Sequence, residues 1–322
     1  MSKLAFLFPG QASQYVGMGR DLYEGFETAR QIYDRADGLL PFDLKSVSFE
    51  GPEERLAQTQ YTQPAVFVHS VAAAELLEER GMVPDAVAGH SLGEYAALVT
   101  AGVLGFEDAL RAVSARAVLM QEAGRRHPGT MAAIIGLSDE AVRAICEATR
   151  SDEDSVYPAN FNAPGQVVVS GSLGAVHRAM EQAKEAGAKR VIELSVSGAF
   201  HSPLMDSARR RMEEVLSQIP FSPARIPIVD NVTADVVQAP DEIRDLLVRQ
   251  LTHPVLWVAS MRNLVSMGVG TIVEVGPGRV LQGLMRRIDR SVRTLGVDRA
   301  EDVRSVFPTE SGKRPAEGTL RA

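Results

Sequence analysis

The fold is decided by residues 86–100, which read AVAGHSLGEYAALVT. Ala86–Ala88 has the composition of a short buried strand, and Leu92–Thr100 is rich in alanine and leucine, as helices are. Between them, Gly89–Gly93 matches the G-x-S-x-G nucleophile elbow, a sharp turn that exposes a serine between a strand and a helix. The free N–H groups at the start of that helix would point back at the Ser91 hydroxyl and could hold an oxyanion. This context predicts a reactive serine.

The segments before the elbow alternate between strand and helix patterns. A strand at Leu4–Phe8 is followed by a glycine-containing loop at Pro9–Gly19 and then by helical patterns to about residue 40. A long apolar helix is expected at Gln63–Glu79, and Gly81 and Pro84 stop it before the next strand. This order predicts a parallel sheet flanked by helices.

The order of the expected strands and helices changes between Thr130 and Ser195. The expected order there is β-α-β-β-α-β, which is the ferredoxin-like arrangement. The six expected elements are Met131–Gly136, Asp139–Thr149, Val156–Phe161, Gln166–Ser170, Gly174–Gly187 and Arg190–Leu194. Strand and helix patterns resume between Ile226 and Ile288. We therefore predict an α/β fold whose larger, α/β-hydrolase-like domain with a parallel sheet is interrupted by a small ferredoxin-like α+β subdomain.

The expected boundaries follow from these patterns. Residues 1–128 and 197–300 would form the large domain, which is discontinuous in sequence, and residues 129–196 would form the subdomain. From Glu301 to Ala322, Pro, Glu, Ser, Gly and Lys dominate and apolar periodicity is lost. Such a composition predicts a disordered tail over residues 301–322.

Composition narrows the class of protein. The chain has 322 residues, of which 45% are hydrophobic and 23% charged, as in ordinary globular proteins. Its net charge of −7 argues against nonspecific binding to nucleic acid or to an anionic membrane. Its one cysteine, Cys146, has no disulfide partner, and no stretch approaches the roughly 18 apolar residues of a membrane span. We expect a cytoplasmic protein without membrane or nucleic-acid partners. Arginine clusters are interpreted as solvated helix faces, with contact to an acidic protein partner as the alternative, among them Arg286, Arg287 and Arg290.

A nucleophilic serine needs a base, and the chain has six histidines. His201 lies in GAFHSP, residues 198–203, where Ser202 and Pro203 have the residue types of a helix start. A loop at a helix entrance can aim an imidazole into a cleft. His90 adjoins the serine and is expected to shape the elbow instead. On the residues alone, His201 fits the base and a structural loop histidine equally well.

Arg116 is the second candidate for a function. On the expected helix Phe106–Glu122 the apolar residues share one face, and Arg116 lies on its flank, whereas Arg111 points away. An arginine that leans into the protein needs an anion. A buried salt bridge or a snorkelling side chain explains the position too, and spacing alone favours those structural roles.

Several separated motifs follow one another between Leu4 and about Val297. They are PGQASQ at 9–14, GHSLGEY at 89–95, NFNAPGQ at 160–166, VSG at 169–171, GAFHS at 198–202, and Gln250 with Pro254 and Trp257. In this order and approximate spacing, the chain resembles the family of malonyl-CoA:acyl carrier protein transacylases.

The resemblance implies a ping-pong mechanism without cofactor or metal. Ser91 would attack the malonyl thioester, with His201 taking its proton and later returning one to the coenzyme A sulfur. The backbone N–H groups of Gln11 and Leu92 would form the oxyanion hole. A main-chain carbonyl near Gln250, rather than an aspartate, would orient the histidine. The partners implied are malonyl-CoA and a phosphopantetheinylated acyl carrier protein, and we expect a monomer.

The resemblance also implies the specificity. Arg116 would pair bidentately with the malonyl carboxylate. Gln63 resembles a polar residue of the same pocket, although a neighbour of a helix N-cap is an alternative. Phe200, directly before the histidine, favours malonyl over methylmalonyl, but one methyl group gives only about 1–3 kcal/mol of discrimination.

Three other functions stay open. A serine hydrolase or thioesterase of the α/β-hydrolase class uses the same elbow, but it predicts a triad acid between Ser91 and His201 in chain order and leaves Arg116 unexplained. A catalytically idle scaffold or carrier-binding module would not need the serine and the histidine. An acyltransferase of a polyketide pathway with another extender unit would share the chemistry.

Overall fold

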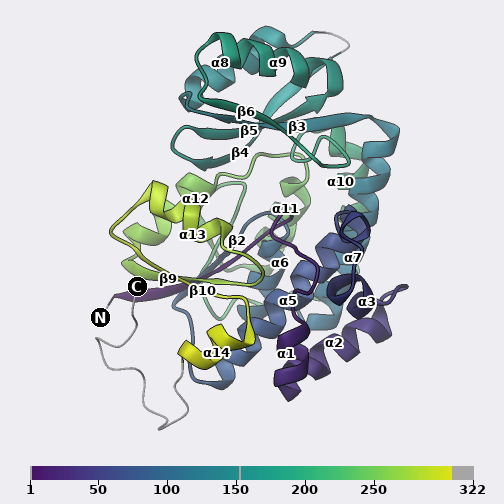
Figure 1. The fold of residues 1–322 in the computed structure, drawn as a ribbon, viewed down its shortest axis with the longest axis vertical. Helices are drawn as coiled ribbons and strands as arrows, with labels where there is room; N and C mark the ends of the chain where they lie inside the picture. Colours follow the sequence, from purple (N-terminus) through teal and green to yellow (C-terminus); the bar gives the residue numbers. More distant parts are fainter. Residues whose placement is uncertain (1, 152–153, 307–322) are drawn as a thin grey trace.

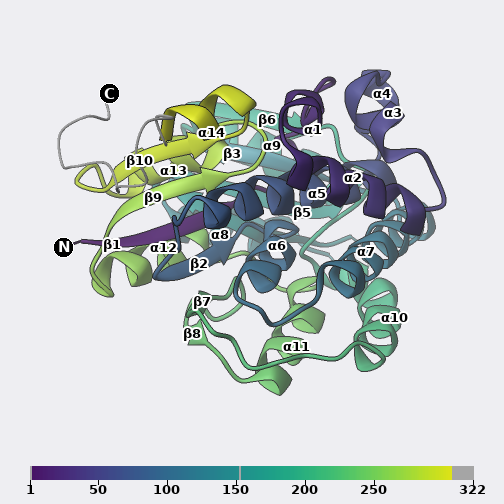
Figure 2. The same cartoon turned by 90° about the horizontal axis from the view of Figure 1, so that it is seen from below.

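The computed structural model describes residues 2–151 and 154–306, and within these residues the chain forms a six-stranded and a four-stranded sheet (Figure 1). The large sheet has the order β10 (Arg293–Val297), β9 (Val269–Val275), β1 (Lys3–Phe8), β2 (Ala86–Gly89), β7 (Ile228–Val229) and β8 (Val236–Val237). Figure 2 shows the strands in this order. Neighbouring strands are parallel from β10 to β7, and β8 is antiparallel to β7.

Helices cover both faces of the large sheet because its central strands are apolar on both sides. Phe6 and Phe8 of β1 belong to a core shared with residues of α5 (Thr59–Glu79), α6 (Gly93–Thr100) and α7 (Phe106–Arg126). Ala5 and Leu7 point the other way, into a core shared with α12 (Trp257–Ser266) and α13 (Val280–Ile288). Further helices of the large domain are α1 (Arg20–Gly25), α2 (Glu27–Leu39), α3 (Leu44–Phe49), α4 (Glu53–Leu56), the 3-10 turn η1 (Pro203–Met205), α10 (Asp206–Ser217) and α11 (Pro240–Gln250).

The small sheet has the antiparallel order β4 (Val156–Ala163), β5 (Gln166–Ser172), β3 (Gly129–Ile135) and β6 (Arg190–Leu194). With α8 (Asp139–Thr149) between β3 and β4 and α9 (Leu173–Glu185) between β5 and β6, this is the ferredoxin-like arrangement. Both helices lie on the face of the sheet that points away from the large domain (Figure 1). The predicted fold class is therefore confirmed. We propose residues 128/129 and 196/197 as the domain boundaries.

Hydrogen bonds of the backbone and of side chains join the small subdomain to the large domain. The N–H of Phe161 donates to the carbonyl of Val255, and the N–H of Val255 donates to the carbonyl of Ala159, each at 2.9 Å. In addition, the guanidinium of Arg287 on α13 donates to the carbonyl of Pro164, at 3.2 Å, and to Oε1 of Gln166. The exposed side chain of Arg287 therefore bridges the two units.

The prediction of a disordered tail was wrong at its start. Ala300–Val306 forms helix α14, because the side chains of Val303 and Val306 are buried in the large core. Positions 307–322 lie outside the described residues. Among the described helices, none combines the length and the hydropathy needed to cross a membrane.

The parallel strands place three loops at one edge of the large sheet. β1, β2 and β7 are neighbours, so the segments after their carboxyl ends lie side by side. These segments are residues 9–19, 90–92 and 230–231. Helix α6 packs directly against the end of β1, since a Cβ added at Gly93 would lie 2.1 Å from the carbonyl oxygen of Phe8. The edge therefore needs glycine at position 93.

We predict that Gly93→Ala destabilises the protein by about 1–3 kcal/mol or more, because the new methyl group meets backbone that can move only by separating α6 from β1. Gly283→Ala is the matched control, since it lies in α13 with no atom within 4 Å of the added Cβ. Helix propensity should make that change neutral or stabilising by about 0.5–1 kcal/mol. Denaturant unfolding of both variants measures the difference, and equal stabilities would contradict the packing argument.

Candidate active site

Ser91 lies in a strained turn between β2 and α6. Its φ is 51°, in the left-handed region that non-glycine residues rarely adopt. The turn is tight because Gly89 and Gly93 touch: a Cβ added at Gly89 would lie 2.0 Å from the carbonyl carbon of Gly93. The amide of Asn231 holds the turn from both sides. Its Oδ1 accepts from the N–H of Ser91 and its Nδ2 donates to the carbonyl of Gly89, each at 2.7 Å.

In the structure, His201 contacts the serine. His201 Nε2 lies 2.8 Å from Ser91 Oγ, and its Nδ1 lies 2.8 Å from the main-chain carbonyl oxygen of Gln250. A carbonyl can only accept, so Nδ1 carries the proton and Nε2 accepts from the serine hydroxyl. His201 also has a positive φ, of 58°. The arrangement is a serine with a base whose orienting group is a carbonyl.

Burial keeps this histidine neutral. Burial of the ring and, second, the positive charge of Arg116 together lower the pKa of His201 to about 3. A neutral imidazole at ordinary pH can take a proton, as a general base must.

Two backbone N–H groups next to the serine are free. Gln11 follows β1, and Leu92 follows Ser91 at the start of α6. Within residues 2–151 and 154–306, neither of these two N–H groups donates a hydrogen bond. The N–H of Ser91 itself is taken by Asn231. Two free donors beside a nucleophile can hold the oxygen of a tetrahedral intermediate.

Arg116 reaches the serine from α7 and is fully buried. Its Nη1 donates to Gln63 Oε1 at 2.8 Å, and its Nη2 donates to Ser91 Oγ at 2.9 Å and to Gln250 Oε1 at 2.8 Å. Within the described residues no carboxylate forms an ion pair with this guanidinium, and its Nε has no partner. Gln63 lies inside α5, so the alternative of an N-cap neighbour was wrong. A buried cation whose hydrogen-bond acceptors are all neutral oxygens is suited to bind an anion.

These groups share one cleft of about 520 Å³ between the two subdomains. Residues of the small sheet line one side, among them Met131 and Val168, and the loop after β1 and helix α13 line the other. The cleft brings together seven of the predicted residues: Gln11, Gln63, Ser91, Leu92, Arg116, Phe200 and His201. Gln250, the eighth, does not line the cleft but forms hydrogen bonds with three of these residues, Ser91, Arg116 and His201.

His90, which is expected to shape the elbow, lines the cleft beside the serine, and its Nε2 lies 2.8 Å from Asn162 Oδ1 in β4. Two further residues of the site did not stand out in the sequence. Asn231 could have been found, because it follows the carboxyl end of a strand next to the elbow. Glu94, 2% exposed, looks in sequence like an ordinary acidic residue in a first helical turn.

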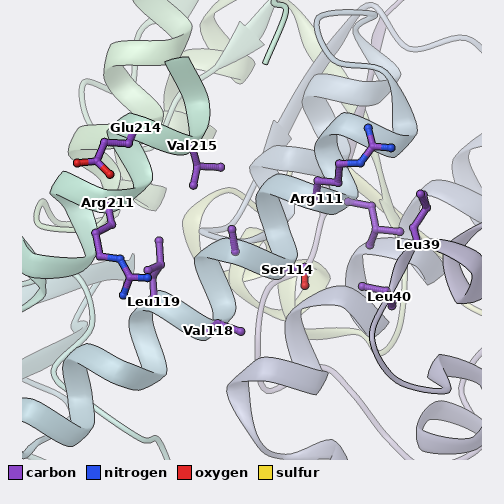
Figure 3. A pocket seen from close by; sticks show the side chains of 11 residues that line it. Leu39, Leu40, Arg111, Ser114, Val118, Leu119, Arg211, Glu214 and Val215 are labelled. Carbon is purple, nitrogen blue, oxygen red and sulfur yellow. The ribbon is translucent and has the colours of Figure 1, made fainter. Parts of the chain in front are cut away.

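A second cavity, of about 480 Å³, lacks this chemistry. Figure 3 shows it between the end of α2, the middle of α7 and α10. Its labelled side chains are Leu39, Leu40, Arg111, Ser114, Val118, Leu119, Arg211, Glu214 and Val215. Ser114 lines this cavity, but no histidine lies among the lining residues to act as its base. Arg211 already forms an ion pair with Glu122, at 2.5 Å. In the part of the chain that the structure describes, no three His, Cys, Asp or Glu side chains gather in a way that could hold a metal ion.

The chain is similar to acyltransferases along nearly its whole length. Residues 5–307 match the family of acyl transferase domains. The chain is 44% identical over 96% of its length to the malonyl CoA-acyl carrier protein transacylase of Bacillus subtilis, and covers 98% of that protein. It is 41% identical over 94% of its length to the enzyme of the same name from Staphylococcus aureus, again covering 98%.

Solved structures of malonyltransferases are similar to this chain in fold and in sequence. A malonyl-transacylase in complex with a type II PKS acyl-carrier protein has a TM-score of 0.91 and 42% identity, with 94% of this chain and 98% of that chain covered. An acyl carrier protein S-malonyltransferase from Vibrio cholerae has a TM-score of 0.90 and 41% identity, with 95% and 100% covered.

The depressed pKa of His201 predicts the pH dependence of serine reactivity. Labelling of Ser91 by a sulfonyl fluoride should keep its rate from about pH 7 down to about pH 5, because the imidazole stays neutral there. A loss of rate centred near pH 6.5, the ordinary histidine value, would contradict the burial argument.

The same shift has a consequence for stability. The unfolded chain takes up a proton at this ring below about pH 6.5 and the folded chain does not, so protonation favours unfolding. The contribution of the neutral His201 ring to the free energy of unfolding is fully present above about pH 6.5. It is lost as the pH falls toward the folded pKa of about 3.

Proposed function

This chain belongs to the acyl transferase family, and we propose that it transfers the malonyl group of malonyl-CoA to the phosphopantetheine thiol of an acyl carrier protein. One observation carries the proposal. The buried guanidinium of Arg116, which has no ion-pair partner among the described residues, donates to the hydroxyl of Ser91 at 2.9 Å. A nucleophile beside an anion site suits an acyl group that ends in a carboxylate.

In the first half-reaction, Ser91 Oγ attacks the thioester carbonyl and its proton moves to His201 Nε2. The oxyanion that forms is held by the N–H groups of Gln11 and Leu92. When the intermediate collapses, the C–S bond breaks and the histidine returns the proton to the coenzyme A sulfur. The products are a malonyl ester on Ser91 and free coenzyme A.

In the second half-reaction, the carrier-protein thiol gives its proton to His201 and its sulfur attacks the ester carbonyl. Collapse breaks the bond to Ser91 Oγ, which takes the proton back. The carbonyl of Gln250 supports the positive imidazolium in both steps without an acidic residue, as the 2.8 Å contact to Nδ1 indicates. This arrangement differs from the acid expected in a hydrolase triad.

Arg116 and Phe200 would set the specificity. The carboxylate can bind the Nη1 hydrogen left free by Gln63 and the Nη2 hydrogen that points at Ser91 in the free enzyme. Phe200, 5% exposed, lines the cleft directly before the histidine and leaves little room for a branched acyl chain. We include a cytoplasmic location and a monomeric state in the proposal, as the sequence predicts.

Ser91→Ala tests the nucleophile. Intact-protein mass spectrometry after brief incubation with malonyl-CoA should show one added malonyl group on the unaltered protein and none on the variant. Peptide mapping should place the group on Ser91. A malonyl group on any other residue would contradict the mechanism.

Arg116→Ala tests the anion site. We predict a fall in kcat/KM of about 100-fold or more with malonyl-CoA, corresponding to about 3 kcal/mol, and a much smaller change with acetyl-CoA, which has no carboxylate. Arg111→Ala is the control on the same helix, because that side chain is exposed and pairs with Asp108. Equal losses for both substrates would make Arg116 a structural residue.

A further inference from the structure

Glu94 is a buried carboxyl group that the mechanism above does not use. It lies in the first turn of α6, three residues after the nucleophile, and is 2% exposed. Its Oε2 accepts a hydrogen bond from Gln250 Nε2 at 2.8 Å. It does not line the cleft, so it can act on the substrate only through its neighbours, which are Gln250, the N–H of Asn231 and the charge of Arg116.

Gln250 connects the parts of the site. Its main-chain carbonyl accepts from His201 Nδ1, and its side-chain Oε1 accepts from Arg116 Nη2 at 2.8 Å. Its Nε2 also donates to the carbonyl of Ser91 at 3.1 Å. The orientation of this one amide therefore bears on the position of the guanidinium.

An amide side chain has two orientations of nearly equal shape, and hydrogen bonding decides between them. A guanidinium only donates, so Oε1 must face Arg116. In the opposite orientation Nε2 would meet the donors of Arg116, and Oε1 would meet the oxygens of Glu94 and Ser91. The 2.8 Å contact with Glu94 is the shorter of the two that hold Nε2 in place.

We propose that Glu94 is a positioning residue, which fixes the Gln250 amide and thereby aligns the Arg116 guanidinium for the malonyl carboxylate. The inference rests on the proposed function of Arg116. Burial, followed by the nearby charge of Asp230, raises the pKa of Glu94 to about 8, against the opposing effects of Gln250 and Arg116. The raised pKa favours the neutral carboxyl, whose carbonyl oxygen still accepts from Gln250 Nε2. An amide keeps such an oxygen and should replace it.

Three variants test the proposal in one assay, the ratio of kcat/KM for malonyl-CoA to that for acetyl-CoA. Glu94→Met keeps the length of the side chain but loses the acceptor, and should lower the ratio about three- to tenfold. Glu94→Gln keeps an acceptor oxygen and should retain the ratio. Glu274→Met is the matched control, because it removes a buried carboxylate that accepts from the N–H groups of Leu281 and Gln282 at the start of α13. It should cost stability and leave the ratio unchanged.

A folded Glu94→Met protein with an unaltered ratio would overturn the inference, since Glu94 would then support only the fold. If that variant does not fold, Glu94→Asp withdraws the carboxyl by one methylene and should lower the ratio in the same way; an unaltered ratio there would overturn the inference too. Arg116→Ala, measured alongside, separates the two claims. If it also leaves the ratio unchanged, the proposed function of Arg116 fails; if it lowers the ratio while Glu94→Met does not, only the inference fails.

Discussion

The buried guanidinium of Arg116 is the interaction on which the rest of the site depends. A charge that is removed from water needs partners, and here they are the amide oxygens of Gln63 and Gln250 and the hydroxyl of Ser91. Those partners come from α5, α11 and the elbow, so the cation holds three elements of the large domain around one point. Neutral oxygens satisfy hydrogen bonds but leave the charge uncompensated. The site is therefore prepared for an anion before one arrives.

Backbone strain is concentrated at the same point. Ser91 and His201 both have positive φ values, and Ala12, next to the free N–H of Gln11, has one as well. Such conformations cost about 1–3 kcal/mol each and persist only where the surroundings enforce them. Around Ser91 the enforcement is visible, because the contact of Gly89 with Gly93 and the amide of Asn231 leave the turn no other geometry. The result is a hydroxyl fixed between its base and the arginine.

The sequence predicted the architecture because the signals involved are local. Apolar runs, turn residues and the elbow glycines lie within a few positions of one another, and the helix Asp139–Thr149 was predicted with its observed ends. Residue patterns alone did not decide the roles of His201 and Arg116. Their contacts with Ser91 span 110 and 25 positions of the sequence, and such contacts leave no periodic signal. Asn231 and Glu94 were missed for the same reason. Helix α14 was missed because two buried valines in a polar segment form too short a pattern.

A crystal structure of the enzyme after reaction with malonyl-CoA would test this account most directly. We predict an ester on Ser91, its carbonyl oxygen within hydrogen-bond distance of the N–H groups of Gln11 and Leu92, and its carboxylate on the Nη1 and Nη2 atoms of Arg116. Gln63 and Gln250 should keep their present contacts with the guanidinium. A malonyl group whose carboxylate points to solvent, with Arg116 still bound to the serine oxygen, would contradict the central claim.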